Sequence, residues 1–559
     1  MHRMFTRREA IVATSAAGLS LALGRVRAAG ASATARGTVF EDLHGTGERR
    51  PGSKGVPGVM VSNGEDVALT DADGRWSLPV AEGDTIFVVK PPGWATQLQP
   101  GTNLPRFSYH HAPQGTLESL GLRYPGLEPT GPLPDSIDFG LQRQVEPSRF
   151  DVLLFTDPQP ESEAELDFVR DDVIMQAASI SAAFGITLGD VMFDDLSMYD
   201  RHNRIVGTLG MPWYNCCGNH DMNFEAPDNA LSRETYKRHF GPRYYAFEYG
   251  QATFFILDNV VYEGADPARP NGAGLYRGGI GARQLAFVRN VLAQIPPERL
   301  AIVCMHIPLS TYLGPDDPRQ TTPDRREFLQ AISGRAATAS FSGHIHTNEH
   351  HYFNGEDGFA GATPHHHQIL TAVSGSWWSG PFDVRGIPVA LASDGTPNGF
   401  HVLSVDGNRC STRMVPAHDP NRAQMRVVLG GPFHRGPEML DEYRTGAMLG
   451  SPIPAAAVGS TELLVNLFNG GPKSTVACVI GPGEPRAMKR VSRPDPFVED
   501  VYARNAATKK PWVTAKNSSH LWQARLPAGL PAGAHRIEIH ATDDYGETHR
   551  HVFVLEVND

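Results

Sequence analysis

The spacing of apolar and polar residues changes twice along this chain, and the changes divide it into three regions. Between residues 35 and 144, short apolar runs such as 59–61 and 85–89 alternate with turns rich in Gly, Pro and Asp. Such spacing is typical of short β-strands joined by tight turns. It predicts an N-terminal all-β sandwich domain over residues 35–146.

From residue 147 to residue 416, apolar runs of strand length alternate with helical patterns. The expected strands cover residues 151–156, 186–189, 213–217, 252–257, 300–305 and 339–342. The expected helices cover residues 163–182, 196–209, 282–294 and 325–332. This alternation predicts a central α/β (α+β) domain whose helices pack on sheets, with an active site beyond the carboxyl ends of the strands.

After residue 417 the helical patterns fade and alternating strand patterns return. The expected strands include residues 461–468, 474–480, 535–540 and 551–556, with turns between them. They predict a C-terminal all-β sandwich domain over residues 417–559. The expected protein is therefore multidomain, with a helix-containing domain between two all-β domains.

The first 33 residues have the pattern of a leader. Arg7-Arg8 stands directly before an apolar stretch at residues 11–23, and Ala28, Ala31 and Ala33 offer small-residue cleavage sites. These features predict a twin-arginine signal peptide and a periplasmic or secreted protein, with an uncleaved anchor or a chance arginine pair as the alternatives. The apolar stretch is short for a bilayer, and no later segment is long enough, so we expect no transmembrane segment in the mature chain.

Charge and cysteine usage narrow the function. The 559 residues carry a formal charge of −11, and removing residues 1–33, which hold five Arg and one Glu, changes this to −11 − 4 = −15. An acidic chain without a basic run is a poor nucleic-acid binder, so no nucleic-acid partner is expected and a nuclease is disfavoured. Cys216, Cys217 and Cys304 are expected to be buried, and a Cys410–Cys478 disulfide remains open.

Five short motifs stand where expected strands of the central domain end. They are Asp157-Pro158-Gln159, Gly189-Asp190, Gly218-Asn219-His220-Asp221, Met305-His306-Ile307-Pro308 and Ser342-Gly343-His344-Ile345-His346. Carboxylate, amide and imidazole groups are ligands of divalent first-row metals. Two such ions about 3.5–4 Å apart can hold the attacking and leaving oxygens of a phosphoryl group.

In order and spacing, these motifs resemble those of the calcineurin-like metallophosphoesterases, over about residues 150–410. The flanking all-β domains resemble those of secreted bacterial members of the family. The resemblance implies a metallophosphoesterase β-sandwich with flanking helices and two divalent metal ions. It makes Asp190 the ligand shared by both ions, and it implies one site of Asp157, Gln159 and His346 and another of Asn219, His306 and His344.

The same resemblance assigns catalytic residues next to the metals. His220 matches a histidine that contacts the phosphate and can protonate the leaving group. Asp221, Asp194 or Asp195 would orient and charge this imidazole. The family has its acidic partner about three residues after the shared Asp, where this chain has Phe193, so the choice among the three carboxylates stays open.

Gln159 departs from the usual Asp-x-His form of the first motif. Its amide is neutral, like an imidazole, and its oxygen has a similar reach, so we expect the site to be intact. Because oxygen is a harder donor than nitrogen, the preference among Mn, Fe, Mg and Zn should shift away from Zn.

These residues predict an exported hydrolase of phosphoester bonds that uses a metal-activated water. Two divalent cations outweigh the carboxylates of Asp157 and Asp190, and the net positive charge would bind a phosphate anion. The expected substrate is a small phosphoester, a phospholipid or a phosphorylated glycan, either diester or monoester. The alternative is a cell-envelope binding protein that uses its β domains, and partner proteins are not indicated.

Several other features have simpler explanations. Asp71 and Asp73 favour a tight turn over a calcium site. The run at residues 365–367, three histidines, favours a cleft-lining or surface loop over a further metal site. Trp377-Trp378 suits core packing or stacking on a substrate equally well, and Arg277 suits a phosphate contact or a loop charge.

Overall fold

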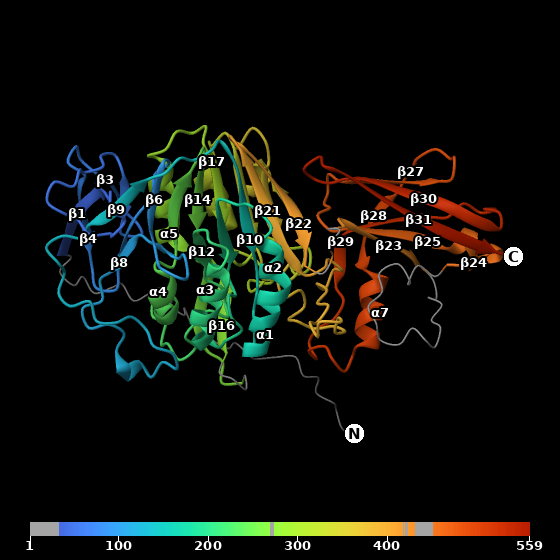
Figure 1. The fold of residues 1–559 in the computed structure, drawn as a ribbon, viewed down its shortest axis with the longest axis horizontal. Helices are drawn as coiled ribbons and strands as arrows, with labels where there is room; N and C mark the ends of the chain where they lie inside the picture. Colours follow the sequence, from blue (N-terminus) through green and yellow to red (C-terminus); the bar gives the residue numbers. More distant parts are fainter. Residues whose placement is uncertain (1–32, 269–272, 418, 420–422, 431–450) are drawn as a thin grey trace, which may run out of the picture.

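Three strand-rich regions lie side by side along the longest axis of the molecule (Figure 1). The computed structural model describes residues 33–268, 273–417, 419, 423–430 and 451–559. The proposed signal peptide at residues 1–33 therefore lies outside the described residues except for Ala33. Strands dominate and helices are few and short, as Figure 1 shows. No helix within the described ranges is both long and apolar enough to span a bilayer.

Two sheets form the central region. The first has the order β12-β11-β10-β21-β22, and its strands are β10 (Arg149–Phe155), β11 (Phe184–Leu188), β12 (Trp213–Cys216), β21 (Gly399–Asp406) and β22 (Arg409–Pro416). The second has the order β13-β14-β17-β18-β20-β19, and its strands are β13 (Tyr245–Tyr249), β14 (Ala252–Ile256), β17 (Leu300–Cys304), β18 (Thr338–Ser342), β19 (Glu349–Phe353) and β20 (His365–Ile369). A separate hairpin pairs β15 (Val260–Ala265) with β16 (Gly274–Gly278).

Neighbouring parallel strands occur in both sheets, and they determine where polar residues gather. β10, β11 and β12 are parallel in one sheet, and β14, β17, β18 and β20 are parallel in the other. β11 and β17 are buried at every position. Strands covered on both faces are mostly apolar, and the polar residues of the five motifs follow where these strands end.

The predicted helices of the central region are confirmed in place, with shorter bounds. They appear as α1 (Glu163–Phe168) continued by a π-helix (Val169–Ile174) and α2 (Met175–Ala177), then α3 (Tyr199–Gly207), α5 (Gly281–Leu292) and α6 (Arg325–Ile332). Short 3₁₀ turns lie at Glu118–Leu120, Leu196–Met198, Gly355–Asp357 and Ala455–Ser460. One helix of this region, α4 (Glu234–Phe240), was not predicted.

The N-terminal region consists of two small sheets. One has the order β4-β1-β9-β6-β7, with β1 (Ala33–Glu41), β4 (Arg75–Val80), β6 (Trp94–Leu98), β7 (Pro105–Arg106) and β9 (Phe139–Arg143). The other has the order β3-β2-β5-β8, with β2 (Met60–Ser62), β3 (Val67–Leu69), β5 (Thr85–Val88) and β8 (Ser108–His110). The Asp71 side chain accepts the N–H groups of Asp73 and Arg75, so this segment is the predicted tight turn.

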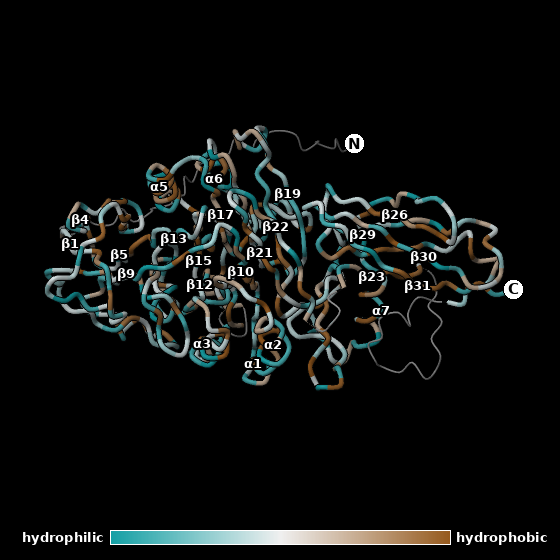
Figure 2. The backbone as a smooth tube through the Cα atoms, turned by 45° about the horizontal axis from the view of Figure 1, so that its top comes forward, coloured by the Kyte–Doolittle hydropathy of each residue, from teal (hydrophilic) through white to brown (hydrophobic). Residues whose placement is uncertain are grey.

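Two more sheets build the C-terminal region. One has the order β23-β25-β29-β28, with β23 (Met425–Gly430), β25 (Glu462–Leu467), β28 (Lys489–Pro494) and β29 (Asn517–Arg525). The other has the order β24-β31-β30-β26-β27, with β24 (Ile453–Pro454), β26 (Thr475–Ile480), β27 (Arg486–Ala487), β30 (Gly533–Thr542) and β31 (Thr548–Asn558). In Figure 2, brown apolar stretches recur along these strands between teal polar ones.

A helix interrupts this C-terminal region, where none was predicted. α7 (Pro496–Arg504) starts with Pro496 at its first turn, and the Asp495 side chain accepts the N–H of Phe497. An Asp-Pro pair is a known start signal of helices. Tyr502 of α7 donates to the Leu391 carbonyl at 2.8 Å, and the hydroxyl of Ser376 lies 2.8 Å from the same Tyr502 oxygen, so α7 attaches the C-terminal region to the central one.

A buried ion pair connects the N-terminal and central regions. Lys90 Nζ lies 2.7 Å from Glu146 Oε1, with side chains 6% and 3% exposed, and it also donates to the Glu248 carbonyl at 2.7 Å. Phe87 and Phe287 form an edge-to-face pair at 5.5 Å across the same boundary. The two regions therefore share one core.

We expect Glu146→Gln to lower the free energy of unfolding by about 3 kcal/mol, because it leaves the buried ammonium of Lys90 without a counter-charge. Arg75→Ala is the matched control, since Arg75 and Asp73 form an ion pair 2.7 Å apart whose side chains are both 66% exposed. Its effect should stay below about 1 kcal/mol. Urea unfolding at neutral pH measures both, and equal effects would contradict a stabilising role for the buried pair.

Candidate metal centre

The carboxyl ends of strands from both central sheets meet at one place. Asp157 follows β10, Asp190 follows β11, and Asn219 lies three residues after β12. From the other sheet, His306 follows β17, and His344 and His346 follow β18. Contacts among neighbours link all seven predicted metal ligands: Asp157, Gln159, Asp190, Asn219, His306, His344 and His346.

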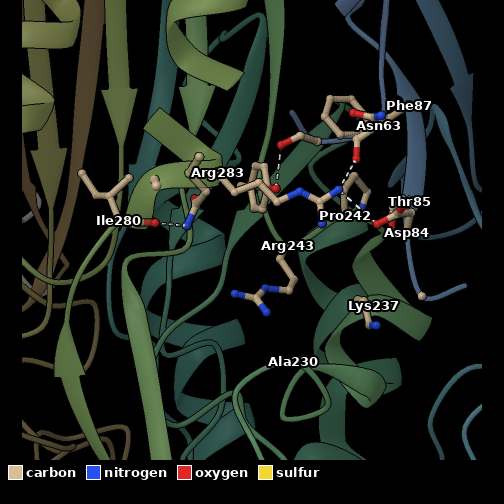
Figure 3. A pocket seen from close by; sticks show the side chains of 16 residues that line it. Asn63, Asp84, Thr85, Phe87, Ala230, Lys237, Pro242, Arg243, Ile280 and Arg283 are labelled. Carbon is tan, nitrogen blue, oxygen red and sulfur yellow. Dashed lines mark hydrogen bonds and ion pairs between the residues drawn. The ribbon is translucent and has the colours of Figure 1, made fainter. Parts of the chain in front are cut away.

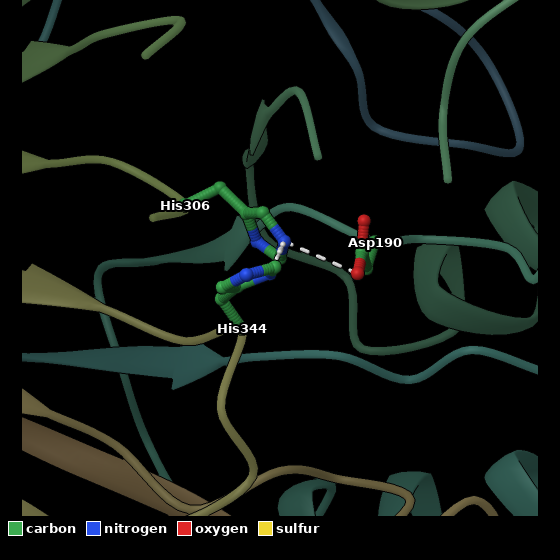
Figure 4. A group of neighbouring side chains, drawn as sticks. All are labelled: Asp190, His306 and His344. Atoms are coloured by element: carbon green, nitrogen blue, oxygen red, sulfur yellow. Dashed lines mark hydrogen bonds and ion pairs between the residues drawn. The ribbon is translucent and has the colours of Figure 1, made fainter. Parts of the chain in front are cut away.

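Four of these residues surround one point. His306 Nε2 lies 3.1 Å from Asn219 Oδ1, 3.1 Å from Asp190 Oδ2 and 3.2 Å from His344 Nδ1. Figure 4 shows Asp190, His306 and His344 pointing toward one another, and their possible ligand atoms all lie within 4.8 Å of each other. This mixed oxygen and nitrogen set suits a divalent first-row metal.

Backbone carbonyls determine which nitrogen atoms face that point. His306 Nδ1 lies 2.9 Å from the Leu188 carbonyl, and His344 Nε2 lies 2.8 Å from the Arg319 carbonyl. A carbonyl accepts only from N–H, so each ring carries its proton on that outer nitrogen. The inner nitrogen atoms, 3.2 Å apart, are then the ones that can act as metal ligands.

The electrostatics of this point call for a positive charge. Burial alone would lower the pKa of His306, but the Asp190 carboxylate raises it to about 9. Burial and the neighbouring His306 lower the pKa of His344 to about 3. Burial would raise the pKa of Asp190, yet His306 and His220 hold it below the usual value. Without a metal, the added proton on His306 supplies that charge, and a metal ion held here would take its place between the two imidazoles and the carboxylate.

A second group of potential ligands lies on the other side of Asp190. His346 Nδ1 donates to the Gly375 carbonyl at 2.5 Å, which leaves Nε2 facing inward, 3.6 Å from Asp157 Oδ1. Both His346 Nε2 and Gln159 Oε1 are buried without a hydrogen-bond partner among the described residues. Because orphaned buried acceptors are rare, these atoms fit a further ion. The departure at Gln159 therefore leaves an oxygen available at this position.

The imidazole of His220 lies beside the potential ligands. Its Nδ1 atom is 2.6 Å from Asp194 Oδ1, and its backbone N–H donates to Asp190 Oδ1 at 2.9 Å. Burial opposes charge on this ring, but Asp194 and Asp190 raise the pKa of His220 to about 9. Of the three carboxylates left open by sequence, Asp194 makes the contact, while Asp195 accepts from Ser197.

Asp221 has a different environment from the one expected for a partner of His220. Its carboxylate accepts the backbone N–H of Gly218 at 2.9 Å and of Val191 at 3.1 Å, and the Tyr199 hydroxyl at 2.8 Å. The side chain is fully buried. It therefore connects the loops that carry Asp190 and Asn219, and we assign it a positioning role in place of direct contact with the His220 ring.

Unusual backbone conformations are concentrated at this site. Nine non-glycine residues of the described chain have positive φ, and five of them belong to the motifs: Asp157, Gln159, Asp190, His344 and His346. Asp194, Trp377 and Trp378 lie beside the site, and Asn103 is the ninth. Each such residue costs about 1–3 kcal/mol unless its surroundings hold it, and such strain gathers at functional sites.

Two motif glycines allow the loops to approach one another. A Cβ atom at Gly218 would collide with the backbone and carboxylate of Asp190, and one at Gly343 would collide with the carboxylate of Asp157. Glycine in these motifs is therefore a packing requirement of the ligands.

The three consecutive histidines do not form a further metal site. His365 and His367 both contact the Ser340 hydroxyl, at 2.7 Å each, inside the sheet. His366 points to the other face, where its Nε2 lies 2.9 Å from His350 Nδ1. The expectation of a cleft-lining or surface loop was wrong, because these residues form the inner strand β20. Arg277 pairs with Glu263 at 3.0 Å.

The cysteines and a cavity at the boundary of two regions lie outside the candidate metal centre. All five cysteines are free, so the Cys410–Cys478 disulfide is absent. A cavity of about 460 Å³ lies between the N-terminal and central regions (Figure 3). Its arginines are paired: Arg283 lies 3.0 Å from Asp84, and Arg243 lies 2.8 Å from Asp258.

Sequence reasoning named Trp377 as a possible stacking residue but missed two other aromatic residues beside the site, Phe193 and Trp512. Phe193 stacks on the His220 ring at 4.6 Å, and Trp377 stacks on His346 at 4.2 Å. Trp512, from the C-terminal region, lies 6.3 Å from Phe193 and 6.2 Å from Trp377 between ring centroids. No sequence signal connects Trp512 to residues more than a hundred positions earlier.

Two family models match the chain. The model for the N terminal of calcineurin-like phosphoesterase matches residues 44–119, and the model for the C terminal of calcineurin-like phosphoesterase matches residues 367–549. The five motifs lie between the two matches, and the second match begins inside β20. Both matches confirm the family resemblance drawn from the motifs.

Among solved structures, the chain is similar to a purple acid phosphatase from yellow lupin (Lupinus luteus) seeds, at 11% identity and a TM-score of 0.35. The similarity covers 65% of this chain and 67% of that chain. No curated protein matches this chain.

We expect Asp221→Ala to lower the free energy of unfolding by about 3 kcal/mol, because it leaves several buried donors without an acceptor. The measurement is urea unfolding with a chelator present, so that loss of metal does not contribute. Asp195→Ala, which removes contacts to Ser197 and Tyr124 at the start of a short turn, should cost about 1 kcal/mol. An Asp221→Ala protein as stable as the parent would contradict the positioning role.

Proposed function

We propose that this chain, a phosphoester hydrolase with the N- and C-terminal domains of the calcineurin-like phosphoesterases, uses two divalent metal ions to hydrolyse a phosphodiester. The observation that carries the proposal is the arrangement of buried donor atoms. The inner nitrogens of His306 and His344 lie 3.2 Å apart beside Asp190, and His346 Nε2 and Gln159 Oε1 have no hydrogen-bond partner among the described residues.

The chain offers two adjoining ligand sets that share Asp190. Asp157, Gln159 and His346 would hold one ion, and Asn219, His306 and His344 would hold the other. When bound, two such ions supply charge for the phosphoryl oxygens and acidify water. The oxygen donors Asp157, Asp190, Gln159 and Asn219 favour Mn, Fe or Mg over Zn.

His220 is the proposed proton donor to the leaving group. Its Nδ1 proton is held by Asp194 at 2.6 Å, so the opposite nitrogen, Nε2, is the one that can present a proton to substrate. The carboxylate of Asp194 beside Nδ1 favours the protonated form of this imidazole. Asp194 would position and charge the ring.

The charges near the site support a diester substrate. Lys510 contacts both Glu161 and Glu165, and Arg319 lies 2.9 Å from Asp317. These cations are already neutralised, whereas a monoester dianion would favour an additional free cation. We propose a small phosphoester, a phospholipid or a phosphorylated glycan in diester form.

Export by the twin-arginine route is part of the proposal. It rests on Arg7-Arg8, the apolar stretch after them and the small residues that follow. A periplasmic or secreted location would give the enzyme access to envelope phosphodiesters. That route carries folded proteins, which would allow metals to be loaded before export.

Activity should depend on metal and on Asp190. Mature protein supplied with Mn, Fe, Mg or Zn should hydrolyse bis-p-nitrophenyl phosphate faster than p-nitrophenyl phosphate. Asp190→Ala should lower this rate about 100-fold or more, because both ligand sets lose a member. Metal content by mass spectrometry should fall in the same variant.

Asp195→Ala is the control, because Asp195 lies in the same loop and contacts Ser197 instead of a proposed ligand. It should keep both its metal and most of its activity. A fully active Asp190→Ala protein would refute the proposed site, and a faster monoester reaction would refute the diester assignment.

His220→Gln should slow hydrolysis most for the esters that have the most basic leaving groups. Loss of a proton donor typically costs about 100-fold or more for a basic alkoxide, whereas p-nitrophenolate departs without protonation. Rates for p-nitrophenyl and alkyl esters, measured in wild type and in His220→Gln, give this dependence. An equal loss on both esters would contradict the proton-donor role.

A further inference from the structure

Trp512 is an exposed tryptophan placed beside the proposed catalytic residues. It is 48% exposed, and a large apolar ring exposed on a surface is typical of binding sites. It belongs to the segment between α7 and β29, whereas the metal centre belongs to the central sheets. The C-terminal region therefore contributes an apolar surface to the rim of the site.

The rings form a continuous arc from one side of the site to the other. Phe193 stacks on His220 with an interplanar angle of 22°, and Trp512 is nearly parallel to Phe193, at 14°. Trp377 stands almost perpendicular to Trp512, at 79°, and stacks on His346 at 21°. We call Phe193, Trp377 and Trp512 the aromatic arc.

Hydrogen bonds hold the segment that carries Trp512 against the central region. The backbone N–H of Lys510 donates to the Ser379 hydroxyl at 2.9 Å, and that of Lys516 donates to the Ser393 carbonyl at 2.9 Å. Val513, next to Trp512, is buried in the core formed with α7. A ring held on both sides of its segment is prepared for contact, because little conformational freedom is lost on binding.

The tryptophan pair at residues 377 and 378 is held in an unfavourable conformation. Both residues have φ near +50°, at 52° and 53°, a region that bulky residues rarely adopt. The Trp378 indole N–H donates to the Pro158 carbonyl at 3.0 Å, beside Asp157 and Gln159. This contact keeps Trp378 buried and leaves Trp377 at the rim, half-buried.

We propose that the aromatic arc binds the organic substituent of the substrate and selects phosphodiesters that carry a flat aromatic or heteroaromatic group. The inference rests on the proposed phosphodiesterase function. Aromatic rings stack on such groups regardless of their detailed substitution. Glu161 and Glu165 outnumber Lys510 beside the arc, which disfavours a second anionic group there. Trp512 is a specificity-determining residue in this arrangement.

The test compares two diesters with the same leaving group. Phenyl p-nitrophenyl phosphate and methyl p-nitrophenyl phosphate both release p-nitrophenolate, and they differ only in the group offered to the arc. Trp512→Ala should raise KM for the phenyl ester about tenfold and leave KM for the methyl ester within about twofold. Trp512→Phe should restore most of the loss, because a ring returns.

A binding measurement separates recognition from turnover. Diphenylphosphinate has no ester bond to break, and calorimetric titration should show that it binds tighter than dimethylphosphinate to the metal-loaded full chain. Trp512→Ala should abolish that difference. Phe382→Ala, which removes another exposed aromatic ring, 54% exposed and outside the arc, should leave it unchanged.

The outcomes distinguish this inference from the proposed function. If wild type hydrolyses both esters but Trp512→Ala changes neither KM nor the phosphinate preference, the arc is not a binding surface and the hydrolase proposal stands. If Trp512→Ala and Phe382→Ala raise KM for both esters alike, the effect is structural and the inference is wrong. If wild type hydrolyses neither ester, the proposed function fails before the arc is tested.

Discussion

The structure depends on one electrostatic constraint: two carboxylates, Asp157 and Asp190, are buried side by side where parallel strands end. Burial of a carboxylate is costly without a compensating charge or donor. Backbone N–H groups of His344 and His220 compensate part of this cost. The remainder calls for positive charge at the centre, which protonated His306 supplies without a metal and which a bound metal ion would supply in its place.

Other features of the centre follow from this constraint. Carbonyls behind each imidazole take the outer ring protons, as Gly375 does for His346, and so orient the inner nitrogen atoms. Asp221 accepts donors from two neighbouring loops and brings their ligands into register. Left-handed backbone conformations at the strand ends allow the chain to turn sharply there and to direct the ligand side chains inward. Such strain persists only because the surrounding contacts hold every one of these turns.

The C-terminal region is a structural part of the site as well as an appended domain. The matched C-terminal family unit begins inside β20 and includes both Trp377 and Trp512. Tyr502 and the segment after α7 attach this region to the loop that carries the strained tryptophans. A rigid attachment of this kind keeps an apolar surface at a constant place relative to His220, the proposed proton donor. In this proposal, chemistry and recognition belong to different parts of one chain.

Much of this protein was determined by its sequence alone. The five motifs and their order indicated the family, and the apolar runs located most of the strands, because strands covered on both faces are mostly apolar. Local signals alone decide neither which carboxylate contacts His220 nor whether the three histidines are exposed. Those outcomes depend on packing: Asp194 reaches the ring and Asp221 does not, and the histidines lie in an inner strand. Trp512 shows the same limit most clearly, since only the folding of distant segments against each other brings it to Phe193.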